Sequence, residues 1–122
     1  MYDNSIKLIE MPEHGSISLC IYTGNEGIFQ LGERINERFE EAYMNGYGWD
    51  ALIRFYISKV DPDLMQEVKT DPEAGMFSAY MSYSEENLDK MRRLKSYIHG
   101  LLSDEIVLFK LIEDNRDSVE WD

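Results

Sequence analysis

The sequence has few of the residues from which catalytic and metal sites are usually built. It contains one cysteine, Cys20, and two histidines, His14 and His99. A single cysteine excludes an internal disulfide and fits a reducing compartment such as the cytoplasm. Cys20 has no histidine or basic neighbour, so we expect a buried structural thiol and not a nucleophile. The histidines have no spacing that pairs them as ligands, and we therefore expect no zinc site.

Long apolar runs are also missing. No stretch approaches the roughly 20 apolar residues that cross a bilayer, and Met1 is followed by Tyr-Asp-Asn-Ser instead of a basic and then apolar leader. We therefore expect no membrane anchor, no signal peptide and a cytoplasmic location.

Basic residues are outnumbered by acidic ones, with 12 Lys and Arg against 24 Asp and Glu, which gives a net charge of −12. Such a surface repels nucleic acid and anionic membranes, and it attracts basic proteins over long distances. The alternative is that the charge only keeps the protein soluble.

Motifs for catalysis or cofactor binding are missing as well. The glycines after residue 23 match neither GxxxxGKS nor GxGxxG, so no phosphate loop is expected. Asp61 and Asp63 lack the glycine and distal glutamate of a calcium loop, and we expect them to cap a short turn. No positioned nucleophile, acid and base can be assigned, which argues against an enzyme and against a bound cofactor.

Alternating apolar residues predict four strands, at 5–11, at 16–23, around Val68 and at 76–83. Pro-Glu-x-Gly occurs between the members of each pair, at 12–15 and 72–75. Proline favours the first turn position and glycine accepts a positive φ, so we expect two hairpins with Gly15 or Gly75 at positive φ.

Apolar stripes with helical spacing predict four helices. They cover 29–44, 49–60, a segment that starts after an N-cap at Ser84 and runs to about Leu101, and one capped by Ser103 that runs to Ile112. An acidic tail follows from about residue 113. No linker interrupts residues 1–122, so the sequence predicts one α+β domain, an antiparallel sheet with helices packed on one face.

Two short runs flank the second predicted helix, Asn-Gly-Tyr-Gly-Trp-Asp at 45–50 and Asp-Pro-Glu-Ala-Gly-Met-Phe at 71–77. They resemble the immunity protein 51 family of bacterial polymorphic toxin systems, whose members typically carry Gly-Asn-Gly-Tyr-Asp-Trp before a helix and a run like the second one about a helix later. The resemblance spans about Phe39 to Leu111. The chain departs from the family pattern at Met44, where the first glycine would stand, and at Gly48, where the aspartate would stand.

This resemblance implies an immunity protein that binds and neutralises a cognate toxin domain, with the toxin's active site or substrate groove as its target. The acidic composition suits a basic nuclease as the toxin. From the residues alone, a small acidic regulatory or adaptor domain that binds a non-toxin protein is the alternative, and the oligomeric state stays open.

The segment Tyr47 to Asp50 has two interpretations. In the structural one, glycines relax the backbone between two helices, Trp49 anchors the core and Asp50 lies in the first helical turn. In the functional one, Tyr47 and Trp49 stay partly exposed beside Asp50 as an interface hot spot.

The turn at 71–75 has the same ambiguity, since it makes a good hairpin loop with or without a partner. The candidate partner-binding residues are Tyr47, Trp49, Asp50, Asp71 and Glu73.

Overall fold

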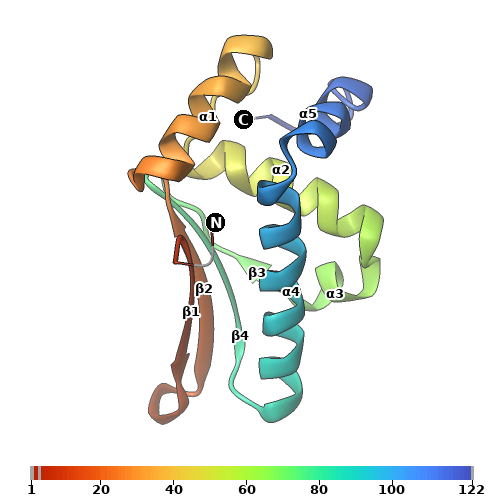
Figure 1. The fold of residues 1–122 in the computed structure, drawn as a ribbon. Coiled ribbons are helices and arrows are strands. Elements are labelled where there is room, and N and C mark those ends of the chain that lie inside the picture. Colours follow the sequence, from red (N-terminus) through yellow and green to blue (C-terminus); the bar gives the residue numbers. More distant parts are fainter. Residues whose placement is uncertain (1, 3, 122) are drawn as a thin grey trace.

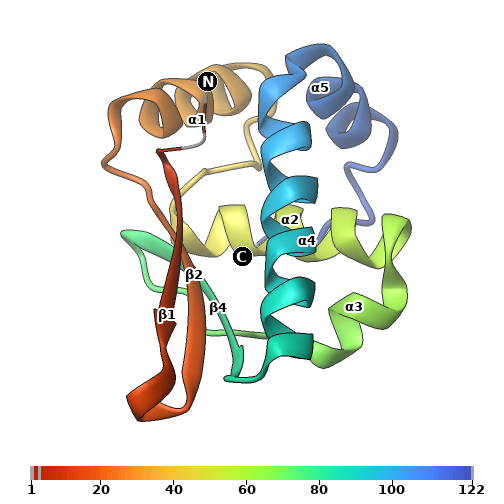
Figure 2. The same ribbon diagram turned by 60° about the horizontal axis from the view of Figure 1, so that its bottom comes forward.

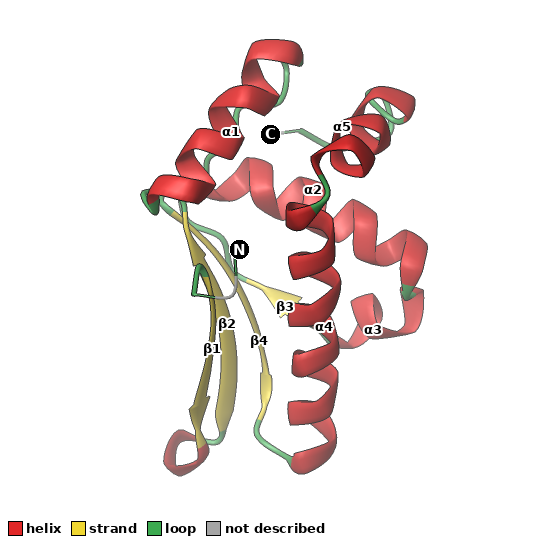
Figure 3. Ribbon diagram, viewed as in Figure 1, coloured by secondary structure: helices red, strands yellow, loops and turns green. Residues whose placement is uncertain are grey.

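The computed structural model describes residues 2 and 4–121, and it has the predicted α+β architecture (Figures 1 and 3). Within these residues a sheet of four strands is combined with five helices, one more than expected. In chain order the elements are β1 (Ile6–Met11), the single 3-10 turn η1 (Pro12–His14), β2 (Ser16–Tyr22), α1 (Glu26–Arg38), α2 (Gly46–Val60), α3 (Pro62–Glu67), β3 (Lys69–Thr70), β4 (Met76–Ser82), α4 (Glu85–Ser103) and α5 (Glu105–Asp114).

The sheet is antiparallel throughout, with the strand order β1-β2-β4-β3. The two predicted hairpins are therefore both present, and their inner strands, β2 and β4, lie side by side in the middle of the sheet (Figure 1). Gly15 has the expected positive φ, 67°, whereas Gly75 lies outside the left-handed region. The second turn is instead closed by paired backbone bonds between Glu73 and Met76, with N···O distances of 2.8 and 3.1 Å.

One face of the sheet forms the core and the other faces away from the helices. On the core face the side chains of Ile17, Leu19 and Ile21 lie beside Phe77 and Ala79, and all five are fully buried. Helices α2 and α4 pack on this face (Figure 2). Cys20 is buried on the other face, with its Sγ 3.9 Å from Ser78 Oγ, which fits the structural role expected of it.

Helix α1 ends at Arg38, well before the predicted end at Met44. Asn36 provides the physical reason, because its side-chain Nδ2 donates to the carbonyls of Phe39, Glu40 and Ala42 at 3.4, 3.2 and 3.2 Å. These bonds stabilise a non-helical loop over 39–45. The apolar stripe continues into the loop, where Phe39 and Ala42 are buried although they are not helical.

Helix α2 begins at Gly46, earlier than the predicted Trp49. Asn45 caps it, since the side-chain oxygen of Asn45 accepts the Gly48 N–H at 2.9 Å. Asp50 consequently lies in the second turn, so its predicted place in the first turn is wrong.

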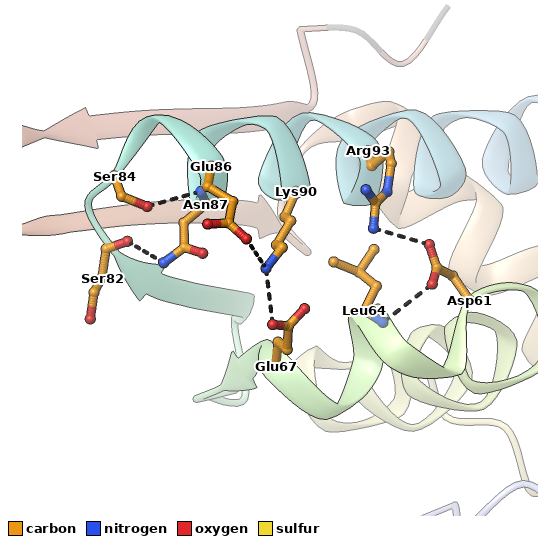
Figure 4. Close-up of polar contacts among 9 residues, drawn as sticks. All are labelled: Asp61, Leu64, Glu67, Ser82, Ser84, Glu86, Asn87, Lys90 and Arg93. Atoms are coloured by element: carbon orange, nitrogen blue, oxygen red, sulfur yellow. Dashed lines mark hydrogen bonds and ion pairs between the residues drawn. The ribbon is translucent and has the colours of Figure 1, made fainter.

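Helix α3 was expected only as a short turn. Asp61 does cap it, with Oδ1 accepting the Leu64 N–H at 3.2 Å. Ion pairs then fasten α3 to α4 (Figure 4): Lys90 Nζ lies 2.9 Å from Glu67, and Arg93 lies 3.4 Å from Asp61.

Helix α4 is capped as predicted by Ser84, whose Oγ accepts the Asn87 N–H at 3.0 Å. Helix α5 is capped by Asp104 and not by Ser103, because the Asp104 carboxylate accepts the Val107 N–H at 3.2 Å. Among the described residues no helix has both the length and the apolar character needed to cross a membrane.

The acidic stretch from residue 113 is not an extended tail. Residues 113 and 114 end α5, and the following residues turn back so that Val119 is 5% exposed. The guanidinium of Arg116 holds this segment to the 39–45 loop by two bonds to Glu41, at 2.6 and 2.8 Å. The same contact lowers the pKa of Glu41 to about 2.

Candidate partner-binding surface

The two motifs that are separated in sequence meet in the structure. The backbone N–H of Gly46, the first residue of α2, donates to Ala74 O at 2.8 Å. The N–H of Thr23, just after β2, donates to Gly75 O at 3.0 Å. The 71–76 turn is therefore fixed on two sides, by the start of α2 and by the end of β2.

The glycines of the first motif serve close packing and not backbone flexibility. A Cβ on Gly46 would lie 1.7 Å from Glu73 O and 2.5 Å from Met76 O, and one on Gly48 would lie 2.2 Å from Tyr43 O. All three atoms are backbone carbonyl oxygens, which cannot move aside as a flexible side chain can. The expectation that these glycines relax a link between helices is wrong, because both lie inside α2 against neighbouring backbone.

Trp49 belongs to the core. It is 1% exposed and is the largest of the fully buried side chains. Its Nε1 has no hydrogen-bond partner among the described residues. Trp49 is thus buried as the structural interpretation expects, and it leaves almost no surface exposed to solvent.

Asp50 is 8% exposed and lies one turn before Arg54, whose guanidinium is 3.7 Å away. Burial raises the pKa of the Asp50 carboxyl, while a hydrogen bond from Thr70 and the charge of Arg54 act in the opposite direction. Its Oδ1 has no hydrogen-bond partner among the described residues.

Tyr47 is exposed, and together with Asp50 it lines a shallow groove of about 380 Å³, here called the Tyr47 groove. The groove also contains Arg54 and Phe55 from α2, Met65 from α3 and Glu120 from the C-terminal segment. Asp71 and Glu73 do not line it; they are exposed on the turn that packs against Gly46. The five predicted residues are thus divided between the core, this groove and the turn.

A second groove, of about 370 Å³, lies between α1, the 39–45 loop and the 71–76 turn, and we call it the Tyr43 groove. Its lining comprises Thr23, Phe29, Gly32, Glu33, Asn36, Tyr43, Met44, Asn45 and Ala74. Phe29 is 55% exposed and Tyr43 is 70% exposed. Both motifs contribute to this groove, one through Asn45 and the other through Ala74.

Phe29 and Tyr43 were not among the candidate partner-binding residues predicted from the sequence. One signal for Phe29 was available, since it falls outside the spacing that links the buried Leu31 and Ile35 on α1. For Tyr43 there was none, because the predicted helix to Met44 treated its position as part of regular structure.

The charged residues around the Tyr43 groove are acidic. Glu33 lines it, and Asp71 and Glu73 are exposed on the adjoining turn. None of these three carboxylates forms an ion pair with another residue in the described part of the chain, unlike Glu41 and Glu113, which pair with arginines. Within that part, no group of three or more His, Cys, Asp and Glu side chains is placed to hold a metal ion.

Comparison with known protein families gives a match. The family model described as Immunity protein 51 matches residues 7–117 of the 122-residue chain. The chain belongs to the immunity protein 51 family. The match runs from β1 to the segment after α5, beyond the stretch Phe39 to Leu111 on which the resemblance was first based. No curated protein and no solved structure gives a significant match. Membership in immunity protein 51 implies an immunity protein, for which a toxin is the natural partner.

Proposed function

We propose that this chain is a cytoplasmic, non-enzymatic immunity protein that binds a basic toxin domain encoded beside it. It neutralises the toxin by covering the active site or the substrate groove. The observation that carries the proposal is the family match over residues 7–117.

The charge distribution supports a basic partner. Three of the arginines, Arg34, Arg38 and Arg116, are engaged by glutamates on neighbouring segments. The chain as a whole keeps a net charge of −12, and part of that excess lies in exposed, unpaired carboxylates such as those around the Tyr43 groove. An acidic surface of this kind raises the encounter rate with a positively charged protein. If the toxin is a nuclease, these carboxylates occupy the positions of the substrate's phosphates.

The test is protection of a bacterial host. The reading frame next to this chain's gene is expressed alone, with this chain, and with an unrelated acidic protein of similar size and net charge. We expect growth only in the presence of this chain, and we expect the two proteins to purify together. Continued killing together with no complex would contradict the proposal and would favour an adaptor domain that binds a non-toxin protein.

A further inference from the structure

We propose that the Tyr43 groove is the surface that docks the toxin, and that it receives an arginine or lysine side chain from a basic segment of the toxin. The aliphatic stem and the charged head of that side chain pack against Phe29 and Tyr43, and the positive charge faces Glu33. This inference rests on the proposed function and adds the place and the chemistry of recognition.

The first support is the exposure of large aromatic side chains at one place. Phe29 comes from α1 and Tyr43 from the 39–45 loop, and each leaves more than half of its surface in water. Aromatic residues are enriched among the side chains that dominate binding energy at protein interfaces. An arginine or lysine placed over an aromatic ring gains cation–π attraction in addition to the burial of its stem.

The second support is that the groove is fixed before binding. Asn36 bonds three carbonyls of the 39–45 loop, and the Asn45 N–H donates to Tyr43 O at 3.0 Å. Gly48 packs so closely against the same carbonyl that a Cβ there would lie 2.2 Å from it. A loop held in this way loses little conformational entropy when a partner docks. The entropic cost of binding is therefore small, and the affinity is higher than it would be for a flexible loop.

The third support is charge complementarity, in which the Tyr43 groove differs from three other surfaces that expose large apolar side chains. No lysine or arginine lines it, and Glu33 is unpaired among the described residues. The Tyr47 groove contains Arg54, which stands 3.7 Å from Asp50. A cationic side chain entering the Tyr47 groove would meet a cation already in place.

Two further apolar surfaces are also mixed in charge. The groove on α5 around the exposed Ile106 is lined by Arg38 and Lys110 as well as by glutamates. On the open face of the sheet, the exposed Tyr80 lies opposite Lys69 of β3. Each presents positive charge to an approaching basic protein, so neither matches the proposed partner as well.

The experiment measures binding of the purified chain to the toxin encoded by the neighbouring reading frame, made harmless by a substitution in its active site. Isothermal titration calorimetry compares Tyr43→Ala, Phe29→Ala and Glu33→Lys with matched controls at other surfaces. Tyr80→Ala is the control for the tyrosine and Ile106→Ala for the apolar residue. Glu13→Lys makes the same charge change as Glu33→Lys on the β1–β2 turn, at the far end of the sheet from α1 (Figure 1).

We expect Tyr43→Ala to raise the dissociation constant by at least about thirtyfold, and we expect Glu33→Lys to raise it far more than Glu13→Lys. Tyr43→Phe keeps the ring and should bind almost as well as the parent. All the substituted side chains are partly or fully exposed, so circular dichroism should give melting temperatures close to that of the parent.

Two results would overturn the inference. If Tyr43→Ala, Phe29→Ala and Glu33→Lys bind like the parent while Tyr80→Ala or Ile106→Ala weakens binding, the toxin docks on the sheet face or on α5, and the proposed function is kept. If the parent chain itself does not bind the toxin, the proposed function fails and the inference fails with it.

Discussion

Two glycines of the first motif pack directly against neighbouring backbone, Gly46 against the second motif and Gly48 against the 39–45 loop. Gly46 and Gly48 both occupy helical positions, where glycine is normally a disadvantage of about 0.5 to 1 kcal/mol relative to alanine. The carbonyl oxygens of Glu73 and Tyr43 occupy the space that a side chain would need. The close packing of α2 against neighbouring backbone therefore requires glycine at these two positions, although alanine is the better helix former.

We expect Gly46→Ala to be severely destabilising, by about 3 kcal/mol or more, since overpacking against atoms that cannot move costs at least the upper part of the usual range. The matched control is Gly100→Ala on α4, where an added Cβ would meet nothing within 4 Å beyond the adjacent backbone of its own helix. That variant should gain about 0.5 to 1 kcal/mol. Urea unfolding followed by tryptophan fluorescence measures both, and equal stability of the two variants would show that the junction adapts easily.

The raised pKa of Asp50 leads to a prediction about how the stability of the protein depends on pH. Its carboxyl is buried, and burial raises its pKa above 3.8, which is its ordinary value. An acid with a raised pKa in the folded state favours folding while it is protonated, and this contribution is lost as the pH rises through the folded-state pKa. At neutral pH the buried charge is therefore a cost to stability.

Asp50→Asn cannot ionise, so it should relieve this cost only where Asp50 is charged. We expect the free energy of unfolding of Asp50→Asn, relative to the parent, to be more favourable at pH 7 than at pH 3.5. Urea titrations at half-unit pH intervals give the difference, with the exposed Asp63→Asn as a control that should show a smaller pH dependence. A difference that does not change with pH would mean that Asp50 titrates normally.

The sequence predicted residue roles well where burial and spacing decide them. Trp49 at the head of an apolar stripe, the thiol of Cys20 and the turn glycine Gly15 are all placed as expected. The sequence did not predict the surroundings of Gly46 and Asp50, because they come from a turn and a strand 20 or more residues later. Contacts between distant segments leave no local pattern to detect.

At the scale of elements, hydrogen bonds from side chains to the backbone at helix ends explain which helix boundaries were predicted correctly and which were not. Ser84 was recognised because a serine precedes two glutamates and an apolar stripe. Ser103 and Asp104 are adjacent and both suit an N-cap, and in the structure the cap is Asp104. The end of α1 depends on the Asn36 side chain, which competes with the helix by bonding loop carbonyls, so periodicity alone placed that end too late.

Helix α3 has only six residues and therefore depends on its cap and on its contacts with α4. Asp61 Oδ1 accepts the Leu64 N–H, and Oδ2 accepts the Tyr97 hydroxyl at 3.1 Å. We expect Asp61→Ala to lower the free energy of unfolding by about 1 to 2 kcal/mol. Asp61→Asn keeps the oxygen that caps the helix, but it replaces Oδ2, which accepts the Tyr97 hydroxyl and faces Arg93, with an amide nitrogen. It should therefore cost less than Asp61→Ala. Equal losses in thermal unfolding would assign the effect to the contacts of Oδ2 and not to the cap.

At the scale of the whole molecule, ion pairs connect α1 to α5, two helices that are far apart in the sequence. Arg34 bonds Glu105, and Arg38 lies 3.1 Å from Glu113, so α1 is fastened to α5. The Arg38 guanidinium also lies 5.5 and 5.6 Å from the ring centres of Phe39 and Phe109. Exposed ion pairs of this kind contribute about 0 to 1 kcal/mol each to the free energy of unfolding, so their main effect is on the relative orientation of α1 and α5.

The fold class and the two hairpins were predictable because strand alternation and turn residues are local signals. The pairing of β2 with β4 and the position of α5 beside α1 were not, because they depend on contacts across more than 50 residues. The candidate site shows the same limit. The two motifs contribute Asn45 and Ala74 to the lining of the Tyr43 groove, but the groove itself forms only where three separate segments converge.

The acidic surface makes the last prediction, which concerns rates of association with the cognate toxin. The net charge of −12 should steer a basic partner toward the chain from a distance, whereas aromatic contacts such as those of Tyr43 act after the two proteins meet. Raising the salt concentration from about 0.05 to 0.5 M shortens the screening length from about 14 to about 4 Å. Stopped-flow mixing with inactivated toxin should therefore show the association rate falling at least about tenfold, with a much smaller change in the dissociation rate. An association rate independent of salt would mean that the charge serves solubility only, and recognition would then have to depend on apolar and aromatic contacts.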